Sequence, residues 1–457
     1  MDESGIALRR LCLWAAATGA DAIPADVAAR IAAVAADTIA CALAASDDPE
    51  LAAWMRDAGD ASAKDLAGKD AAAENPVAGD PAAAAARTAV AANWLQLDEG
   101  HHRLMCHAGI YCVPAGLAKC EAADLTLDRF LHAVALGYEM TCRLARAWTF
   151  GAAPVHPHSL WSVLGATSTL GILRGLDGDT LCLALLHAAT MAAPRPFSVV
   201  ADGGLAANLW VGTGVQQAFA CTAWAENGLQ APGHALARLG EMLGVQNDAS
   251  AYTNDLGHAW AVRQNYFKVL PCAGQSHAAL EALLEARAGL AAQGVDVFEE
   301  TVRIDAEVHD FAVIMARREI PTSLAARFSI PHLLAVAWLH GRTDAQALGA
   351  GFLHDARVAR LREAIRLGPL RPALPPPHHR AARVTVTLDG GPSAQGCCLA
   401  PLGSQARPLE KADIARKCLS LARGRQAPLL RALLDAPHAT GDAGAVKLRT
   451  LLHPSGG

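Results

Sequence analysis

The sequence predicts a mainly α-helical protein in which a large all-helical domain is joined to a smaller α+β domain. Alanine has the highest helix propensity, and it dominates a composition that is 52% hydrophobic but only 5% aromatic, which favours helices. Apolar residues recur at helical spacing through the first half, and period-two alternation becomes more frequent after residue 265. With 457 residues the chain is long for one hydrophobic core, so we expect two domains.

The first part of the chain is expected to form helices of the large domain. An amphipathic helix ends near Gly19, and its acidic start argues against a signal peptide, so we expect a mature cytoplasmic chain. A strongly helical segment spans 24–45, with proline in the tolerated first turn. Residues 56–80 lack an apolar face and are expected to form a solvated surface segment. An alanine-rich helix then begins at Pro81.

The middle of the chain is expected to add further helices. Residues 113–147 hold two helices that meet at Thr126, a plausible N-cap. The helix predicted at 159–173 is rich in glycine, alanine and serine, which would let neighbouring helices approach closely. Two more helices are expected at 180–191 and 209–226.

The smaller α+β domain is expected over residues 265–401. Period-two alternation predicts strands at 300–308 and 383–388. Helical patterns interleave with them at 273–290, 324–339 and 356–367. From Glu410 the pattern is helical again, so residues 402–457 are expected to rejoin the helical domain of residues 1–264.

Composition and spacing argue against several classes of partner and cofactor. The net charge is −5, which leaves no basic footprint for nucleic acid. The sequence contains no run of 18 apolar residues that is free of charged residues and glycine, so we expect no membrane span. The twelve cysteines lack the spacings of a zinc site and are expected to be reduced and mostly buried. No phosphate loop or nucleotide fingerprint is present, so we expect neither a metal nor a cofactor.

A polar run between two predicted helices is the main candidate for chemistry. It holds an Asp-Glu pair, three histidines and an arginine within the ten residues from Asp98 to His107, with Gly100 inside the run and Gly109 just after it. Loops held by rigid elements often carry functional side chains. A carboxylate beside an imidazole can share proton transfer, because both pKa values can be tuned towards neutrality. A solvated loop is the plain alternative, and a nucleophilic thiol at Cys106 is disfavoured because no triad order accompanies it.

The same run, LDEGHHRLMCHAG followed by VPAGLA, resembles the signature of the MmgE/PrpD family, which includes 2-methylcitrate dehydratase and cis-aconitate decarboxylase. Four later motifs fall in the family's order and extend the resemblance over nearly the whole chain: VHPHSLWSVLGA, NLWVGTGVQQAFACTAWAENG, FKVLPCAGQSHAALEALL and ARFSIPHLLAVAWLHGR. The resemblance implies an α+β lid inserted before the last helices, a homodimer, and a lyase that acts on a small carboxylate.

The resemblance also implies catalytic roles for four residues. Asp98 matches the signature's first aspartate, and His107 matches the histidine of a His-Pro-Gly motif whose proline is replaced here by Ala108. His156 and His277 match two further active-site histidines. The plain alternatives are a helix cap for Asp98 and ordinary loop or helix-start positions for the histidines.

Two departures from the decarboxylase branch concern substrate binding. Ala207 stands in place of a lysine, and His332 stands in place of a tyrosine. A replacement cation is expected among Arg103, Arg195, Lys268 and Arg327, because arginine binds carboxylates in a bidentate manner. The residues that we expect to bind substrate are His102, Arg195, Lys268, Arg327 and His332.

These observations support two hypotheses of different kinds. The first is a cofactor-independent lyase in which His107, oriented by Asp98, moves a proton alpha to a carboxylate. Dehydration or hydration, decarboxylation and epimerisation all remain open, because they pass through related enolate-like species. The second is a non-catalytic binding or scaffold protein that kept the fold, which the missing lysine and tyrosine would explain.

Overall fold

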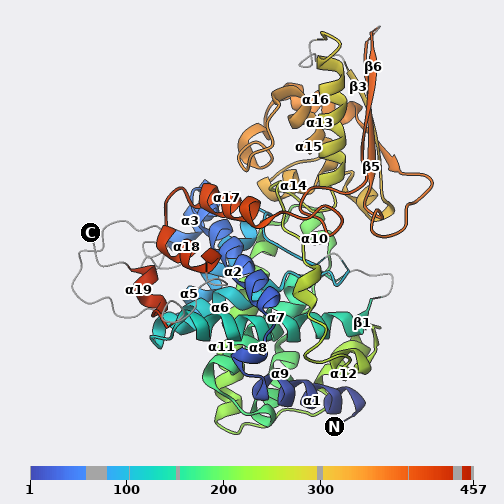
Figure 1. Ribbon diagram of the computed structural model, residues 1–457. Coiled ribbons are helices and arrows are strands. Elements are labelled where there is room, and N and C mark those ends of the chain that lie inside the picture. Colours follow the sequence, from blue (N-terminus) through green and yellow to red (C-terminus); the bar gives the residue numbers. More distant parts are fainter. Residues whose placement is uncertain are drawn as a thin grey trace.

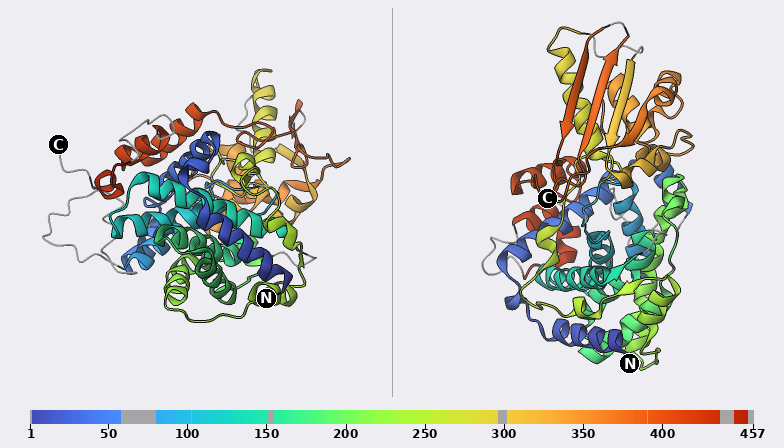
Figure 2. Two further views of the ribbon diagram at one scale, coloured as in Figure 1. Left: turned by 60° about the horizontal axis from the view of Figure 1, so that its bottom comes forward. Right: turned by 90° about the vertical axis from the view of Figure 1, so that its right-hand side faces the viewer.

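The computed structural model describes residues 2–57, 80–101, 103–150, 155–295, 302–389, 391–435 and 445–453. These residues form a helical body with an α+β part standing at one end of it (Figures 1 and 2). The predicted mainly helical fold with a small α+β region is therefore confirmed. Most of the predicted surface segment at 56–80 lies outside the described residues.

The helical body is built largely from the N-terminal half of the chain. Its helices are α1 (Glu3–Ala17), α2 (Ala25–Ala45), α3 (Pro49–Asp57), α5 (Pro81–Trp94), α6 (Ala108–Ala122), α7 (Leu127–Ala147), α8 (Pro157–Arg174), α9 (Gly178–Met191), α11 (Leu209–Glu226) and α12 (Ala235–Met242). A short antiparallel pair of strands, β1 (Trp148–Thr149) and β2 (Gln246–Asn247), ties the end of α7 to the segment after α12. The predicted cap at Thr126 is confirmed, since its side chain accepts from the backbone nitrogen of Arg129.

Helix α2 lies among the other helices and carries much of the core. Its apolar residues at helical spacing, from Val27 to Ile39, are almost fully buried. By length and composition, α2 alone among the described helices could cross a membrane, but 72% of its most apolar window is buried inside this protein. Burial on nearly every side of a helix is what the core of a large helical body requires.

Small residues on α8 allow the close helix contacts that the sequence predicted. A Cβ atom added at Gly165 would lie 2.8 Å from the Thr141 hydroxyl of α7, and one at Gly171 would lie 2.4 Å from a methyl group of Leu181 on α9. On α11, a Cβ atom at Gly214 would overlap Ser162 of α8. The small residues therefore let α7, α9 and α11 pack closely against α8.

The α+β part contains a four-stranded sheet of order β4-β3-β5-β6. Its strands are β3 (Val302–Val308), β4 (Arg366–Pro369), β5 (Ala382–Leu388) and β6 (Ser393–Cys398). Strand β3 is parallel to β4 and antiparallel to β5, and β5 is antiparallel to β6. Helix α13 (His277–Ala291) packs on β5 and β6 (Figure 1). The predicted strands match β3 and β5, whereas β4 and β6 were not predicted.

One predicted helix is divided in two. Residues 324–339 were expected to be continuous, but the structure has α14 (Ser323–Arg327) and α15 (Ile330–His340). Ser329 caps α15 by accepting from the backbone of His332, and Pro331 occupies its first turn. Because proline has no backbone N–H, it cannot continue the hydrogen bonding of α14 but is tolerated in the first turn of a new helix, so the chain breaks and restarts there. Helix α16 (Ala356–Ala364) packs beside α15.

The C-terminal helices lie on the helical body, as the sequence predicted. Helices α17 (Lys411–Ala422) and α18 (Ala427–Asp435) pack on α2, and α19 (Leu448–Leu452) packs on α6 (Figure 1). A second hydrophobic core fills the α+β part, and it includes Phe197, Ala207 and Trp210 of the helical body. The segment from 197 to 210 therefore provides apolar side chains against which the α+β part packs.

Candidate active site

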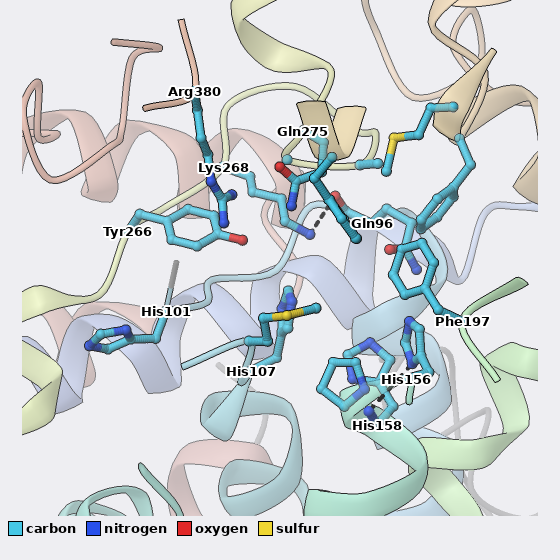
Figure 3. Close-up of a pocket in the computed structure, with 17 residues that line it drawn as sticks. Gln96, His101, His107, His156, His158, Phe197, Tyr266, Lys268, Gln275 and Arg380 are labelled. Carbon is cyan, nitrogen blue, oxygen red and sulfur yellow. Dashed lines mark hydrogen bonds between the residues drawn. The ribbon is translucent and has the colours of Figure 1, made fainter. Parts of the chain in front are cut away.

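A cavity opens where the loop after α5, the start of α8 and the first residues of the α+β part meet (Figure 3). The loop brings His101 and His107, and the start of α8 brings His156 and His158. The remaining residues around the cavity are Gln96, Met105, Pro157, Phe197, Tyr266, Lys268, Ala273, Gly274, Gln275, Phe311, Met315, Phe328 and Arg380. Polar and basic groups thus converge from three distant parts of the sequence, which is typical of a binding or catalytic pocket.

Asp98 and His107 are in direct contact at this cavity. Oδ2 of Asp98 lies 2.8 Å from Nδ1 of His107, and Oδ1 lies 3.4 Å from Nζ of Lys268. Asp98 is fully buried behind His107. Burial alone would raise the pKa of Asp98, but the charges of Lys268 and His107 outweigh it and lower that pKa to about 2. Asp98 is therefore a carboxylate throughout the neutral range.

The surroundings of Nδ1 fix the proton on His107. This nitrogen lies 2.8 Å from the Asp98 carboxylate and 2.8 Å from the carbonyl oxygen of Glu99. Both neighbours only accept hydrogen bonds, so Nδ1 must carry a proton. In the neutral ring, Nε2 then holds the free lone pair. His107 is thus arranged as a base whose orientation is set by Asp98.

Glu99, the second carboxylate of the loop, holds the loop and α6 together. Its Oε1 accepts from the backbone of Gly109 at 2.9 Å. Its Oε2 accepts from Tyr138 and from Asn265, each at 3.0 Å. Burial raises the pKa of Glu99 despite these bonds. Since both oxygens are occupied inside the protein, Glu99 positions the loop and does not face the cavity.

A short backbone pairing joins this loop to the α+β part. Gly100 and Tyr266 exchange two hydrogen bonds, at 3.1 and 2.8 Å. This pairing places Lys268 beside Asp98, and Nζ of Lys268 also donates to the carbonyl of Gln96 at 3.0 Å. A Cβ atom at residue 100 would lie 2.9 Å from the Tyr266 hydroxyl and 3.0 Å from the His107 ring, so the close approach needs glycine here.

His156 and His158 face the cavity from the first turn of α8. Their ring centres are 4.5 Å apart, and His158 lies 5.0 Å from the ring of His107. Nδ1 of His156 accepts from the backbone of His158 at 3.4 Å, so Nε2 carries the proton when the ring is neutral. Burial, with the charge of His107 second, lowers the pKa of His156 to about 3. Burial also lowers the pKa of His158. Both rings are therefore neutral hydrogen-bonding groups.

Several residues of the cavity were not among the predicted site residues. Arg380, from the loop before β5, and the phenol of Tyr266 both reach towards Lys268 (Figure 3). Burial raises the pKa of Tyr266, and burial lowers that of Arg380 to about 10, so the phenol stays protonated and the guanidinium stays charged at neutral pH. Gly100 and Tyr266 pair over more than 160 residues, and no local pattern in the sequence signals such a contact.

Other predicted residues lie outside the cavity wall. Arg195 places its guanidinium over the ring of Trp210, 5.5 Å from the ring centre, and its backbone carbonyl accepts from His156. Arg327 is buried, donates to the carbonyl of Ala345 and lies 3.9 Å from Asp48. Neither side chain is among the residues that line this cavity, and a role for Arg195 or Arg327 in substrate binding stays a prediction.

The predicted histidines of the α+β part are likewise not on the cavity wall. His332 is fully buried on α15, with Nδ1 3.5 Å from Arg362, and it does not line this cavity, so its contact with substrate stays a prediction. His277 is buried at the start of α13, where burial lowers its pKa to about 3. It is not among the residues that line the cavity. His102 lies outside the described residues.

The thiols and possible metal ligands complete the description of the site. All twelve cysteines are free and all but Cys397 are buried. Within the described ranges, no group of three or more His, Cys, Asp or Glu side chains is arranged to hold a metal ion. The ionisable side chains among the described residues of the cavity wall are imidazoles, cations and a phenol.

The fold and the cavity define a class: two-part, mainly helical proteins with a histidine-rich pocket at the junction of the parts. The MmgE/PrpD N-terminal domain matches residues 9–250, and the MmgE/PrpD C-terminal domain matches residues 270–429. The chain therefore belongs to the MmgE/PrpD family. Membership of this family indicates a lyase of the dehydratase type. No curated protein matches the chain.

Proposed function

We propose that the protein is a cofactor-independent lyase that acts on a small di- or tricarboxylate by proton transfer alpha to a carboxylate. The observation that carries this proposal is the contact of 2.8 Å between Asp98 and Nδ1 of His107 at the wall of a basic cavity. It leaves Nε2 of His107 free to act as a base. Cytoplasmic location and a homodimer, both expected from the sequence and the resemblance, are part of the same proposal.

The cavity can bind and activate a carboxylate. Lys268 and Arg380 are its two cations, and the neutral rings of His156 and His158 supply hydrogen bonds. Paired cations stabilise the negative charge that develops on a carboxylate when the neighbouring carbon loses its proton. They act in a site partly shielded from water, where such stabilisation is strongest.

The proton transfers can be balanced with residues on the cavity wall. Nε2 of His107 takes the proton from the carbon alpha to the carboxylate, and the electron pair of that C–H bond forms an enolate-like species. In a dehydration, this pair expels hydroxide from the next carbon. The hydroxide becomes water with a proton from the His107 imidazolium or from the Tyr266 hydroxyl. We favour dehydration or hydration. Return of the proton to the other face would use the same first step, whereas in a decarboxylation the electron pair left by carbon dioxide would take a proton from the His107 imidazolium.

The test is NMR of the protein with a panel of di- and tricarboxylates in deuterated water, with His107→Gln as the matched control. We expect deuterium incorporation or water loss for at least one substrate with the unmodified protein and none with the variant. Equal rates in both proteins would assign the chemistry to another group. A complete absence of reaction across the panel would contradict the lyase proposal and support a binding protein.

A further inference from the structure

A second cavity adjoins the first on the side of the loop before β5. We call it the outer cavity. Its wall consists of Arg103, Pro376, Pro377, His379, Arg380, Pro401, Ser404, Gln405 and Ala406. Arg380 belongs to both cavities and reaches inwards towards Tyr266 and Lys268 (Figure 3). The two cavities are therefore neighbours that share one cation.

The outer cavity is basic although the chain as a whole is acidic. Its charged side chains are Arg103 and Arg380, His379 is also on its wall, and none of its described wall residues is acidic. The whole chain has 44 acidic and 39 basic residues, so the lack of carboxylates on the described wall of the outer cavity differs from the composition of the chain as a whole. The pKa of His379 is lowered, mainly by burial and next by the positive charges of Arg380 and Arg103.

Polar atoms of the outer cavity also lack partners. Oγ of Ser404 belongs to a residue only 8% exposed, and it has no hydrogen-bond partner within the part of the chain that the structure describes. The same holds for the buried Nδ1 atom of His379. A buried polar group without a partner destabilises the folded protein, so such groups point to a ligand that completes their hydrogen bonds. An anion fits both these groups and the two guanidinium ions.

We propose that the outer cavity binds a second carboxylate of the substrate, remote from the reacting carbon, and so selects longer polycarboxylates over short dicarboxylates. This inference rests on the proposed function, because it concerns the same substrate. One carboxylate lies with Lys268 and Arg380 beside His107. The remote carboxylate lies with Arg103, His379 and Ser404. Arg380, shared by both cavities, contacts the part of the substrate between them.

The test measures equilibrium binding, so that it does not depend on turnover. The probes are tricarballylate, a tricarboxylate without a hydroxyl group to eliminate, and succinate, a short dicarboxylate. We expect Arg103→Gln to weaken tricarballylate binding at least about tenfold, the loss typical of one charge-assisted hydrogen bond, and to change succinate binding less than about twofold. Ser404→Ala should weaken tricarballylate binding in the same direction by a smaller factor.

The control is Arg263→Gln, which removes the same charge from an exposed pair with Asp26 on the helical body. It should leave binding of both probes unchanged, and thermal melts check that all variants fold. Equal loss of both probes in Arg103→Gln, or no loss of either, would overturn the outer-cavity inference. If no polycarboxylate is turned over but the difference between the probes persists, the proposed reaction fails while the second binding position stands.

Discussion

At the scale of single residues, the arrangement depends on which nitrogen of His107 carries the proton. A carboxylate on one side and a carbonyl on the other leave Nδ1 no role but donor. Lys268 lies on the opposite side of the same carboxylate, so Asp98 is shared between a cation and an imidazole. A substitution of Asp98, His107 or Lys268 is therefore expected to change the interactions of the other two residues.

His107→Gln is predicted to abolish turnover, because glutamine lacks a basic nitrogen. Its thermal midpoint should stay close to that of the unmodified protein, since the ring is partly exposed and contributes little to the core. Asp98→Asn should reduce turnover less completely, because the base remains but the amide no longer fixes its orientation and the proton on Nδ1 as the carboxylate does. Near-normal turnover of His107→Gln in this assay would shift the assignment to His156.

A second residue-scale prediction concerns Ala207, which replaces a lysine of the decarboxylase branch. The residue is buried in the apolar core beside Phe197 and Trp210, so no cation lies at this point. Loss of one cation that pairs with a substrate carboxylate costs about 2–5 kcal/mol. We therefore expect slow decarboxylation of cis-aconitate, measured as carbon dioxide release. Efficient release would mean that Lys268 and Arg380 supply all the charge that the reaction needs.

The local part of the site could be read from the sequence, and the long-range part could not. Asp98 and His107 lie in one loop, so their proximity needed only a fold-back near Gly100. Arg380 and Tyr266 come from other elements, and their place depends on how the α+β part stands on the body. Arg327 is of the residue type expected to bind a carboxylate, but its guanidinium donates to the carbonyl of Ala345 and lies near Asp48. A motif gives residue types, whereas tertiary contacts decide which side chains remain available.

At the scale of elements, the C-terminal helix α17 supports the loop from behind. Lys417 forms a buried ion pair with Asp37 of α2, 2.5 Å between the charged atoms, and donates to the carbonyl of Leu97 at 2.9 Å. Burial raises the pKa of Asp37 even beside the lysine, and Asp37 in turn outweighs burial to raise the pKa of Lys417. One side chain thus joins α2, α17 and the residue before Asp98.

Lys417→Met is predicted to destabilise the protein by about 3–5 kcal/mol, because it leaves the Asp37 carboxylate buried without a partner. Chemical denaturation measures the change. The double variant with Asp37→Asn should recover much of the loss, since no charge is then left unpaired. If the single variant is as stable as the unmodified protein, the ion pair has no structural role. The double variant has no charge left unpaired, so its turnover reports on the loss of the hydrogen bond from Lys417 to the carbonyl of Leu97.

The elements were predictable in kind more than in extent. Alanine-rich helical spacing located α2, α9 and α11 to within a few residues. Strand β4, by contrast, is a four-residue edge strand, and β6 contains glycine and two cysteines, so neither shows a clear period-two pattern. Both are strands because β3 and β5 present hydrogen-bonding edges to them, which is tertiary information.

At the scale of the whole molecule, the two parts depend on each other. The second core includes residues 197–210 of the helical body, while α17 and α18 follow the sheet in sequence but pack on α2. The cavity lies along this junction, so its shape is set by both parts. Composition and periodicity indicated a helical body and an α+β part, but not which surfaces meet, because that depends on long-range packing.

The buried histidines around the junction predict how stability depends on pH. Burial lowers the pKa of His101 to about 4 and those of His156 and His277 to about 3, from an ordinary value of 6.5. Between the folded and unfolded values the unfolded chain binds more protons, so stability is fully present above pH 6.5 and is lost as the pH falls. Each such histidine contributes roughly 1 kcal/mol per pH unit within that range.

His277→Gln isolates one of these contributions. We expect the free energy of unfolding to fall less steeply between pH 6.5 and pH 4.5 in this variant than in the unmodified protein. The variant lacks one histidine that binds a proton more readily in the unfolded chain than in the folded protein. Buried carboxyls with raised pKa values, such as Glu139, act in the opposite direction but are present in both proteins, so they cancel in the comparison. His258→Gln, at an exposed position, serves as the control and should leave the slope unchanged. Parallel slopes for His277→Gln and the unmodified protein would show that His277 is protonated as readily in the folded protein as in the unfolded chain.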